Sequence, residues 1–181
     1  MKRLFFVLIF VFVFLTLRTQ AFAQAPTPTP TPPPSEYALA YPGILPDNPL
    51  YKIKAFRDWI VSVLIADPLK KASFDVLQAD KRLVATQYLL QEAPPKGPLA
   101  IETLSKGENY FFEAITQMKQ AKKQGEDAYD ILQKLRLSNA KHLEVVLQLE
   151  QTTAGDIHTG LQVQEKRIRE FRNIVAKEGL R

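Results

Sequence analysis

The chain has 181 residues, of which 46% are hydrophobic, and its 24 basic and 19 acidic side chains give a net charge of +5. This length suffices for one ordinary domain with extensions, and the composition allows a substantial hydrophobic core. The absence of cysteine excludes disulfides, thiolate metal sites, cysteine nucleophiles and a lipid anchor on an N-terminal cysteine.

The first 23 residues have the pattern of a secretory signal peptide. Lys2 and Arg3 precede the uncharged apolar run 4–17, and Ala-Phe-Ala follows at 21–23. We predict cleavage after Ala23. An uncleaved membrane anchor is the alternative, but as a helix this run is only about 21 Å long, short of a ~30 Å hydrocarbon core.

Removal of this segment changes the charge balance. Lys2, Arg3 and Arg18 leave with it, so the mature chain keeps 21 basic against 19 acidic residues, a net charge of +2. This balance does not require a phosphate-binding face. We expect export through the secretory pathway, to the cell envelope or the medium, and no nucleic-acid partner.

A Pro/Thr-rich linker, residues 24–36, follows the expected cleavage site. Alternating prolines remove backbone donors and fix φ, so the linker cannot form a helix or a central strand. Its repeat 26–34 predicts a polyproline II rod about 28 Å long at ~3.1 Å per residue. A stiff spacer is favoured over a docking site for a partner or a glycosylated stalk.

The next segment, 41–54 (YPGILPDNPLYKIK), is unusually apolar for a loop. We interpret it as a clamp that closes one end of the domain, and an exposed binding patch is the alternative. Its prolines restrict the unfolded chain, and Gly43 permits a turn that returns Ile44 and Leu45 to the helices. Leu45→Ala should then cost about 2–5 kcal/mol, as for a buried leucine. The loop residues given this structural or interaction role are Tyr41, Gly43, Leu45, Pro46, Asn48 and Tyr51, with both tyrosine rings on the domain and their hydroxyls in water.

Two similar cap-and-proline pairs predict the first two helices. Asn48 with Pro49 begins a helix that ends near Ala66, and Asp67 with Pro68 begins one that runs to Ala93. The first helix has an apolar stripe at 50, 53, 56, 60 and 64. Its apolar run 59–66 follows three basic residues and could lie on a membrane surface, but burial in the core is favoured.

The prolines of 94–98 end the second helix, and a third helix is expected over 98–124, closed by Gly125. Its predicted inner face consists of Ile101, Leu104, Phe111, Ile115 and Met118.

The remainder, 127–177, carries two apolar stripes. The first has heptad spacing at 131, 135, 138, 142, 145, 149 and 152, and the second lies at 157, 161, 168, 171 and 175. A single helix would be about 77 Å long, twice the length of the others, so a break near 153–156 is favoured over a stutter. The prediction is an all-α fold, an antiparallel bundle of four to five helices over 37–181.

Several motifs resemble a family of exported helical proteins, the domain of unknown function 5667. The similarity covers roughly residues 37–150, and its motifs are YPGILPDNPLY (41–51), DPLKKASF (67–74), LQADKRL (77–83) and LSKGENY (104–110). The resemblance implies an exported helical domain and no assigned activity. Gly107 departs from the family, which tends to have alanine there; a glycine inside a helix costs about 1 kcal/mol.

Polar side chains in the helices give few candidates for chemistry. Ser138 and Lys141 have a Ser-x-x-Lys spacing, but the other motifs of penicillin-recognising enzymes are missing. His142 and His158 are too few and too far apart for a zinc site, so core or capping roles are favoured.

Asp80 lies next to the apolar stripe of the second helix, where an unpaired charge is costly. A salt bridge between helices is favoured for Asp80 and Arg82, and a ligand-binding carboxylate is the alternative.

We conclude that the sequence predicts an exported helical protein of the cell envelope that acts by binding or as structural material, with no catalytic activity and no cofactor. Its partner is expected to be an envelope protein or polymer, and peripheral contact with a membrane is a further interpretation. A periplasmic small-ligand or metal-responsive sensor or chaperone is the alternative, and a cell-wall hydrolase comes third.

Overall fold

The structure is a computed structural model that describes residues 36–92 and 96–179. The predicted signal peptide 1–23 and all of the predicted linker except Glu36 lie outside these residues. The described part is all-helical and contains no strand. It falls within one compact unit, Thr31–Arg181.

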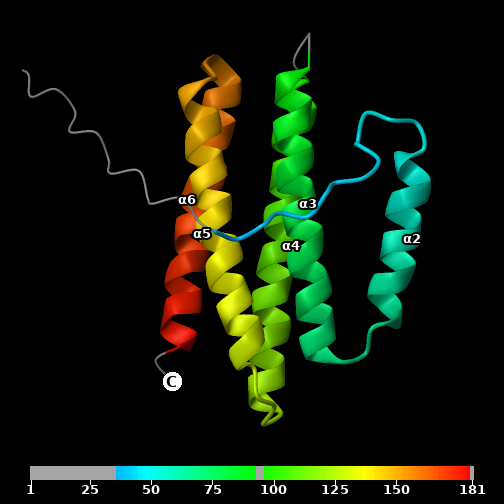
Figure 1. Cartoon of the computed structure of the whole chain (residues 1–181), viewed down its shortest axis with the longest axis vertical. Helices are drawn as coiled ribbons and strands as arrows, with labels where there is room; N and C mark the ends of the chain where they lie inside the picture. The colour runs from blue at the N-terminus through cyan, green and yellow to red at the C-terminus, as the bar shows by residue number, and fades with distance from the viewer. Residues whose placement is uncertain (1–35, 93–95, 180–181) are drawn as a thin grey trace, which may run out of the picture. The chain divides into compact units, whose positions relative to one another are not determined.

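Five helices make up the described part (Figure 1). They are α2 (Tyr51–Leu64), α3 (Pro68–Gln91), α4 (Gly97–Lys123), α5 (Tyr129–Gln151) and α6 (Gly155–Glu178).

Helices α3 to α6 form the predicted helical bundle. α3 packs against α4 and α5, and α6 packs against the same two helices. The hairpins α3–α4 and α5–α6 are each antiparallel, whereas α3 and α5 run in the same direction (Figure 1). The predicted break is confirmed, because α5 ends at Gln151 and α6 begins at Gly155 and returns along it.

Local signals set most helix ends. The Asp67 carboxylate accepts hydrogen bonds from the backbone N–H groups of Leu69 and Lys70 at 2.9 and 3.1 Å, so the predicted N-cap of α3 is confirmed. Gly125 has a φ of 82° and follows Gln124, the C-cap of α4, as expected for a residue that closes a helix in the left-handed region. Gly155 has a φ of 60° at the start of α6, which allows the chain to reverse there.

The first predicted helix is shorter than expected. Asn48 makes the expected side-chain bond, because its carboxamide oxygen accepts from the Leu50 N–H at 2.9 Å. The Tyr51 N–H, however, bonds to the Asn48 carbonyl three residues back. This bond closes a single tight turn and is not the i→i+4 bond that begins an α-helix. Helix α2 therefore begins at Tyr51 and ends at Leu64.

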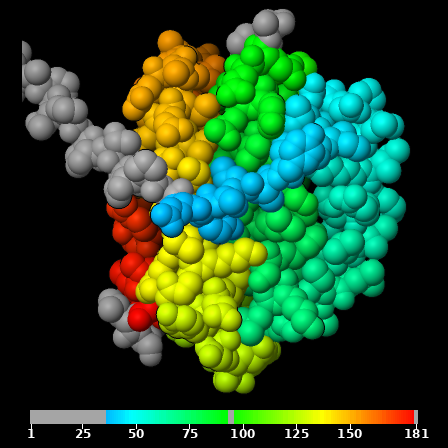
Figure 2. Space-filling model, in the orientation of Figure 1, coloured from blue at the N-terminus to red at the C-terminus, as the bar shows by residue number. Residues whose placement is uncertain are grey.

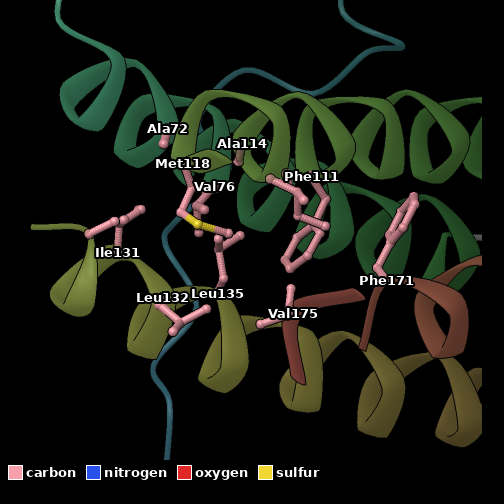
Figure 3. Close-up of a cluster of buried hydrophobic side chains, with 13 residues drawn as sticks. Ala72, Val76, Phe111, Ala114, Met118, Ile131, Leu132, Leu135, Phe171 and Val175 are labelled. Carbon is pink, nitrogen blue, oxygen red and sulfur yellow. The ribbon is translucent and has the colours of Figure 1, made fainter. Parts of the chain in front are cut away.

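Two clusters of buried apolar side chains fill the bundle. Figure 3 shows the first, in which Phe111 and Met118 of α4 meet Leu135 of α5, with Phe171 and Val175 of α6 alongside. The second contains Leu83, Leu104, Leu143, Leu161 and Ile168. Of the predicted inner face of α4, four residues are buried and Ile101 is half-buried.

Gly107 has a packing reason to be glycine. An added Cβ would lie 3.1 Å from Cβ of Arg82 and 3.4 Å from the Ala79 carbonyl oxygen, so α3 and α4 approach closely at this point. The close packing offsets the helical cost of glycine.

Candidate functional site

Asp80 is buried in the bundle and is paired, as the sequence predicted. Its Oδ1 accepts a hydrogen bond from the Ser138 hydroxyl at 2.6 Å and lies 3.1 Å from Nε2 of His142, both on α5. Its Oδ2 accepts from the hydroxyl of Tyr37 at 2.7 Å. Tyr37 belongs to the extended segment before α2, which crosses the surface of the bundle in Figure 2.

His142 links Asp80 to a second buried acid, Glu108 of α4. Nδ1 of His142 lies 2.8 Å from Oε1 of Glu108, and neither side chain reaches solvent. Burial alone lowers the pKa of His142, but the charge of Glu108 and the hydrogen bond to Asp80 outweigh burial and raise it to about 9. The ring is therefore an imidazolium at neutral pH and donates to both carboxylates.

The same contacts act on the partners of His142. Burial raises the pKa of Asp80, but the hydrogen bond and charge of His142, with the bonds from Ser138 and Tyr37, hold it below its ordinary value. Burial and the bond to Asp80 raise the pKa of the Tyr37 phenol. This buried ion cluster, Tyr37, Asp80, Glu108, Ser138 and His142, connects α3, α4 and α5 to the extended segment.

The buried ion cluster contains the kinds of side chain that an acid–base site uses, but these side chains are closed to solvent. Asp80, Glu108, Ser138 and His142 are at most 2% exposed, so a substrate cannot reach them in this conformation. Oε2 of Glu108 has no hydrogen-bond partner among the described residues. Within residues 36–92 and 96–179, no group of three or more acidic or histidine side chains has the arrangement to hold a metal ion. The cluster is best placed to fix how the helices pack.

Arg82 lies apart from the buried ion cluster. It donates a hydrogen bond to the hydroxyl of Tyr51, and its guanidinium lies 5.0 Å from the ring centroid of Tyr110 on α4. The predicted salt bridge of Arg82 is replaced by this aromatic contact. Arg82 thus ties α2 to α3 and α4, and the Tyr51 hydroxyl serves as an acceptor where a water contact was expected.

The loop before α2 is held differently from the predicted clamp. Gly43 has the expected positive φ, 69°. The turn is fixed by Lys54, whose ammonium donates to the carbonyl oxygens of Pro42 and Ile44 at 2.6 and 3.2 Å. The prediction of a tyrosine ring on the domain is wrong for Tyr41, which is 76% exposed.

The predicted burial of the other loop residues is also incomplete. Leu45 and Pro46 are only half-buried, Ile44 is exposed, and Asn48 is exposed at the turn. Leu45 therefore cannot contribute as a fully buried leucine.

Helix α2 presents its apolar side to solvent, which overturns the predicted burial in the core. The side that faces the bundle carries Tyr51, Ala55, Asp58 and Ser62, and Asp58 is the one buried residue of the helix. The apolar residues of α2 and the preceding Leu50 cover most of the remaining circumference. Those exposed to solvent are Leu50, Ile53, Phe56, Trp59, Ile60, Val61, Val63 and Leu64.

The physical reason lies in the bundle itself. Four helices close their core without a fifth, because α3 to α6 already cover one another's apolar stripes.

Among the helices of residues 36–92 and 96–179, none combines the length and the hydrophobicity that a membrane span requires. The exposed apolar side of α2 is the largest concentration of such residues in the described chain. Tyr41 and Ile44 are exposed in the loop before it, and the other exposed large side chains are scattered over α3 to α6.

A groove of about 480 Å³ lies between the loop and α2. Its lining combines apolar side chains with three cations, Lys54, Arg57 and Lys81. The remaining lining residues are Tyr41, Pro42, Gly43, Ile44, Leu50 and Ile53. The groove opens beside the exposed apolar side of α2, so a bound molecule could contact both.

Sequence reasoning missed Tyr37, Glu108 and Lys81. Glu108 had a readable signal, because it lies four residues after Leu104 and three before Phe111, on the predicted inner face of its helix. Tyr37 had none, since it belongs to no apolar stripe or motif. Lys81 lies in the LQADKRL motif, but nothing in that motif marks a lysine that faces a groove.

No family model, curated protein or solved structure matches the chain.

Proposed function

We propose that this protein is an exported, non-catalytic binding protein of the cell envelope that attaches to the surface of an anionic membrane through α2. The observation that carries this proposal is the orientation of α2, which places its polar side on the bundle and its apolar side in solvent. An exposed apolar surface of this kind marks an interaction site in a folded protein.

The composition of the surface favours a lipid bilayer as its occupant. Trp59 and Phe56 stack with ring centroids 5.9 Å apart and are accompanied by long aliphatic side chains, the residues that enter the headgroup region of a bilayer. As a helix of 14 residues, α2 is about 21 Å long, which fits a helix that lies in the interface.

Charge supports an anionic membrane in particular. Lys52, Lys54 and Arg57 lie on α2, and Lys81 of α3 lines the same groove as Lys54 and Arg57. Asp58 is the one acid of α2, and it faces the bundle and is bonded to Arg57. Long basic side chains beside an apolar surface can bury their methylene groups and leave their charges at the phosphates.

The other functions considered have less support. A hydrolase needs acids that a substrate can reach, and the two convergent acids here, Asp80 and Glu108, are enclosed. A chaperone or sensor needs a broad concave apolar surface, whereas the apolar side of α2 is convex and the groove beside it is lined with three cations. We also propose, from the motifs of 41–51 and 67–83, that the chain belongs to the domain of unknown function 5667 family, with which an all-helical fold is consistent.

Vesicle co-sedimentation tests the attachment. The mature protein should sediment with vesicles that contain phosphatidylglycerol, and the double substitution Phe56→Ser/Ile60→Ser should weaken binding by at least about tenfold, because each side chain contributes ~1.5–3 kcal/mol when buried. The matched control is Leu137→Ser/Val163→Ser, which removes two exposed apolar residues of α5 and α6.

The proposal fails if both double variants bind vesicles like the wild type, or if the wild type does not bind. A second outcome would assign the surface to another copy of the chain. In that case the wild type would sediment as a dimer in analytical ultracentrifugation, the Phe56→Ser/Ile60→Ser variant would be monomeric, and neither would bind vesicles.

A further inference from the structure

The groove between the loop and α2 has a net positive lining. Of its described lining residues, Lys54, Arg57 and Lys81 are cationic and none carries a carboxylate. Asp58, one helical turn after Lys54 and bonded to Arg57, offsets part of this charge. Burial lowers the pKa of Lys54, and Lys81, Arg82 and Arg57 lower it further against the opposing charge of Asp58. Like charges held this close favour the entry of an anion.

Each cation keeps a donor for such an anion. Lys54 uses two of its three N–H groups on the carbonyls of Pro42 and Ile44, which carry only partial charges. Arg57 bonds to Asp58 through Nε and Nη2, which leaves Nη1. Lys81 has no hydrogen bond or ion pair to any described residue and is half-exposed at the groove.

The rest of the groove is apolar and continues onto α2. Ile44, Leu50 and Ile53 line it and are all exposed, and Ile53 lies on the same side of α2 as Phe56 and Ile60. A volume of about 480 Å³ lies within the range of ligand sites, ~300–1,000 Å³, and suits a headgroup better than a whole lipid.

We propose that this groove binds the phosphodiester headgroup of one anionic phospholipid, while the acyl chains of that lipid continue along the exposed side of α2. This headgroup site rests on the proposed membrane attachment and adds a specific ligand to it. Lys81 is its main specificity residue, because its charge has no partner within the described protein. Lys54 has a second role, since its bonds to the loop carbonyls shape the groove.

A soluble lipid separates the headgroup site from attraction to a surface. In ¹⁵N-labelled mature protein, monomeric dihexanoyl phosphatidylglycerol should shift the amide of Gly43, which lines the groove, in a saturable manner. Dihexanoyl phosphatidylcholine, which is zwitterionic, should leave this amide unchanged. Equal shifts with the two lipids contradict the inference. Saturation by inorganic phosphate at the same or lower concentration also contradicts it, because the site would then recognise a free anion.

Two lysine variants test the site on vesicles of phosphatidylcholine with a minority of phosphatidylglycerol. Lys81→Gln should lower the affinity at least about tenfold, as for a lost hydrogen bond to a charged group. Lys52→Gln removes the same charge from an exposed position of α2 outside the groove, and should cost no more than about fivefold through diffuse attraction.

The outcomes of this experiment are distinct. If the wild type binds and the two variants are weakened equally, the headgroup site is wrong and the membrane attachment stands. If the wild type does not bind, the attachment is wrong and the headgroup site fails with it.

Discussion

The hydroxyl of Tyr37 lies 2.7 Å from Oδ2 of Asp80 and joins the segment before α2 to a carboxylate buried 43 residues later in the chain. The segment is therefore fixed to the bundle through the ion cluster of Asp80, His142 and Glu108. Tyr37→Phe removes only the hydroxyl and leaves one oxygen of a buried carboxylate without its donor.

We expect Tyr37→Phe to lower the free energy of unfolding by about 1.5–3 kcal/mol, the range for a hydrogen bond to a charged group. Urea denaturation measures this directly. Tyr129→Phe is the control, because Tyr129 is exposed on α5 and should change stability by less than ~0.5 kcal/mol. Equal effects of the two substitutions would mean that the hydrogen bond from Tyr37 to Asp80 does not stabilise the fold.

The imidazolium of His142 predicts how stability depends on pH. Its pKa is about 9 in the folded protein, above the ordinary value of 6.5, so the folded state binds the additional proton. This contribution is complete below pH 6.5 and is lost as the pH rises through 9. The melting temperature should therefore fall between pH 7 and pH 9.

The variant His142→Gln isolates this effect. It should be destabilised by about 3–5 kcal/mol at pH 7, because it leaves two buried carboxylates without their cation. The fall in melting temperature between pH 7 and pH 9 should also be much smaller in this variant than in the wild type. A variant that keeps the wild-type pH profile would show that other groups cause it.

Substitutions in the loop 41–54 test how much this partly exposed loop contributes to stability. Because Leu45 is half-buried, Leu45→Ala should cost about 1–2 kcal/mol, below the range for a fully buried leucine. Asn48→Ala should cost ~1 kcal/mol through loss of the bond to the Leu50 N–H. Denaturant unfolding measures both, and a cost above 3 kcal/mol for Leu45→Ala would restore the original interpretation of a buried clamp.

Export makes a prediction that does not depend on the fold. Intact mass spectrometry of the protein recovered from its native envelope should give a chain that begins at Gln24, since cleavage is predicted after Ala23. A chain that retains Met1 and fractionates with membranes would mean that the apolar run 4–17 is an anchor.

The helices could be predicted because their signals are local. The Asp67 cap, the left-handed Gly125 and the break before Gly155 each depend on a few neighbouring residues and the backbone conformations that they allow. The apolar stripes of α4, α5 and α6 predicted most of the core positions for the same reason, since one helical face must be covered.

The sites could be predicted only in part, because they depend on how helices meet. The stripes place Asp80, Glu108 and His142 on or beside inner faces, but the axial stagger of α3, α4 and α5 decides that these three side chains pair. The spacing of apolar residues also predicted the stripe of α2 correctly. It did not predict that this stripe faces away from the core, because an apolar face has the same spacing whether it is buried or exposed.

The emission of Trp59 tests the attachment of α2 to a membrane most directly. Trp59 is the only tryptophan of the chain and lies 59% exposed on α2, so its fluorescence reports on this helix alone. We predict that vesicles containing phosphatidylglycerol shift its emission to shorter wavelength, and that lipids brominated on their acyl chains quench it. Emission that stays at the wavelength of a tryptophan in water, with no quenching at saturating lipid, would contradict the proposed attachment.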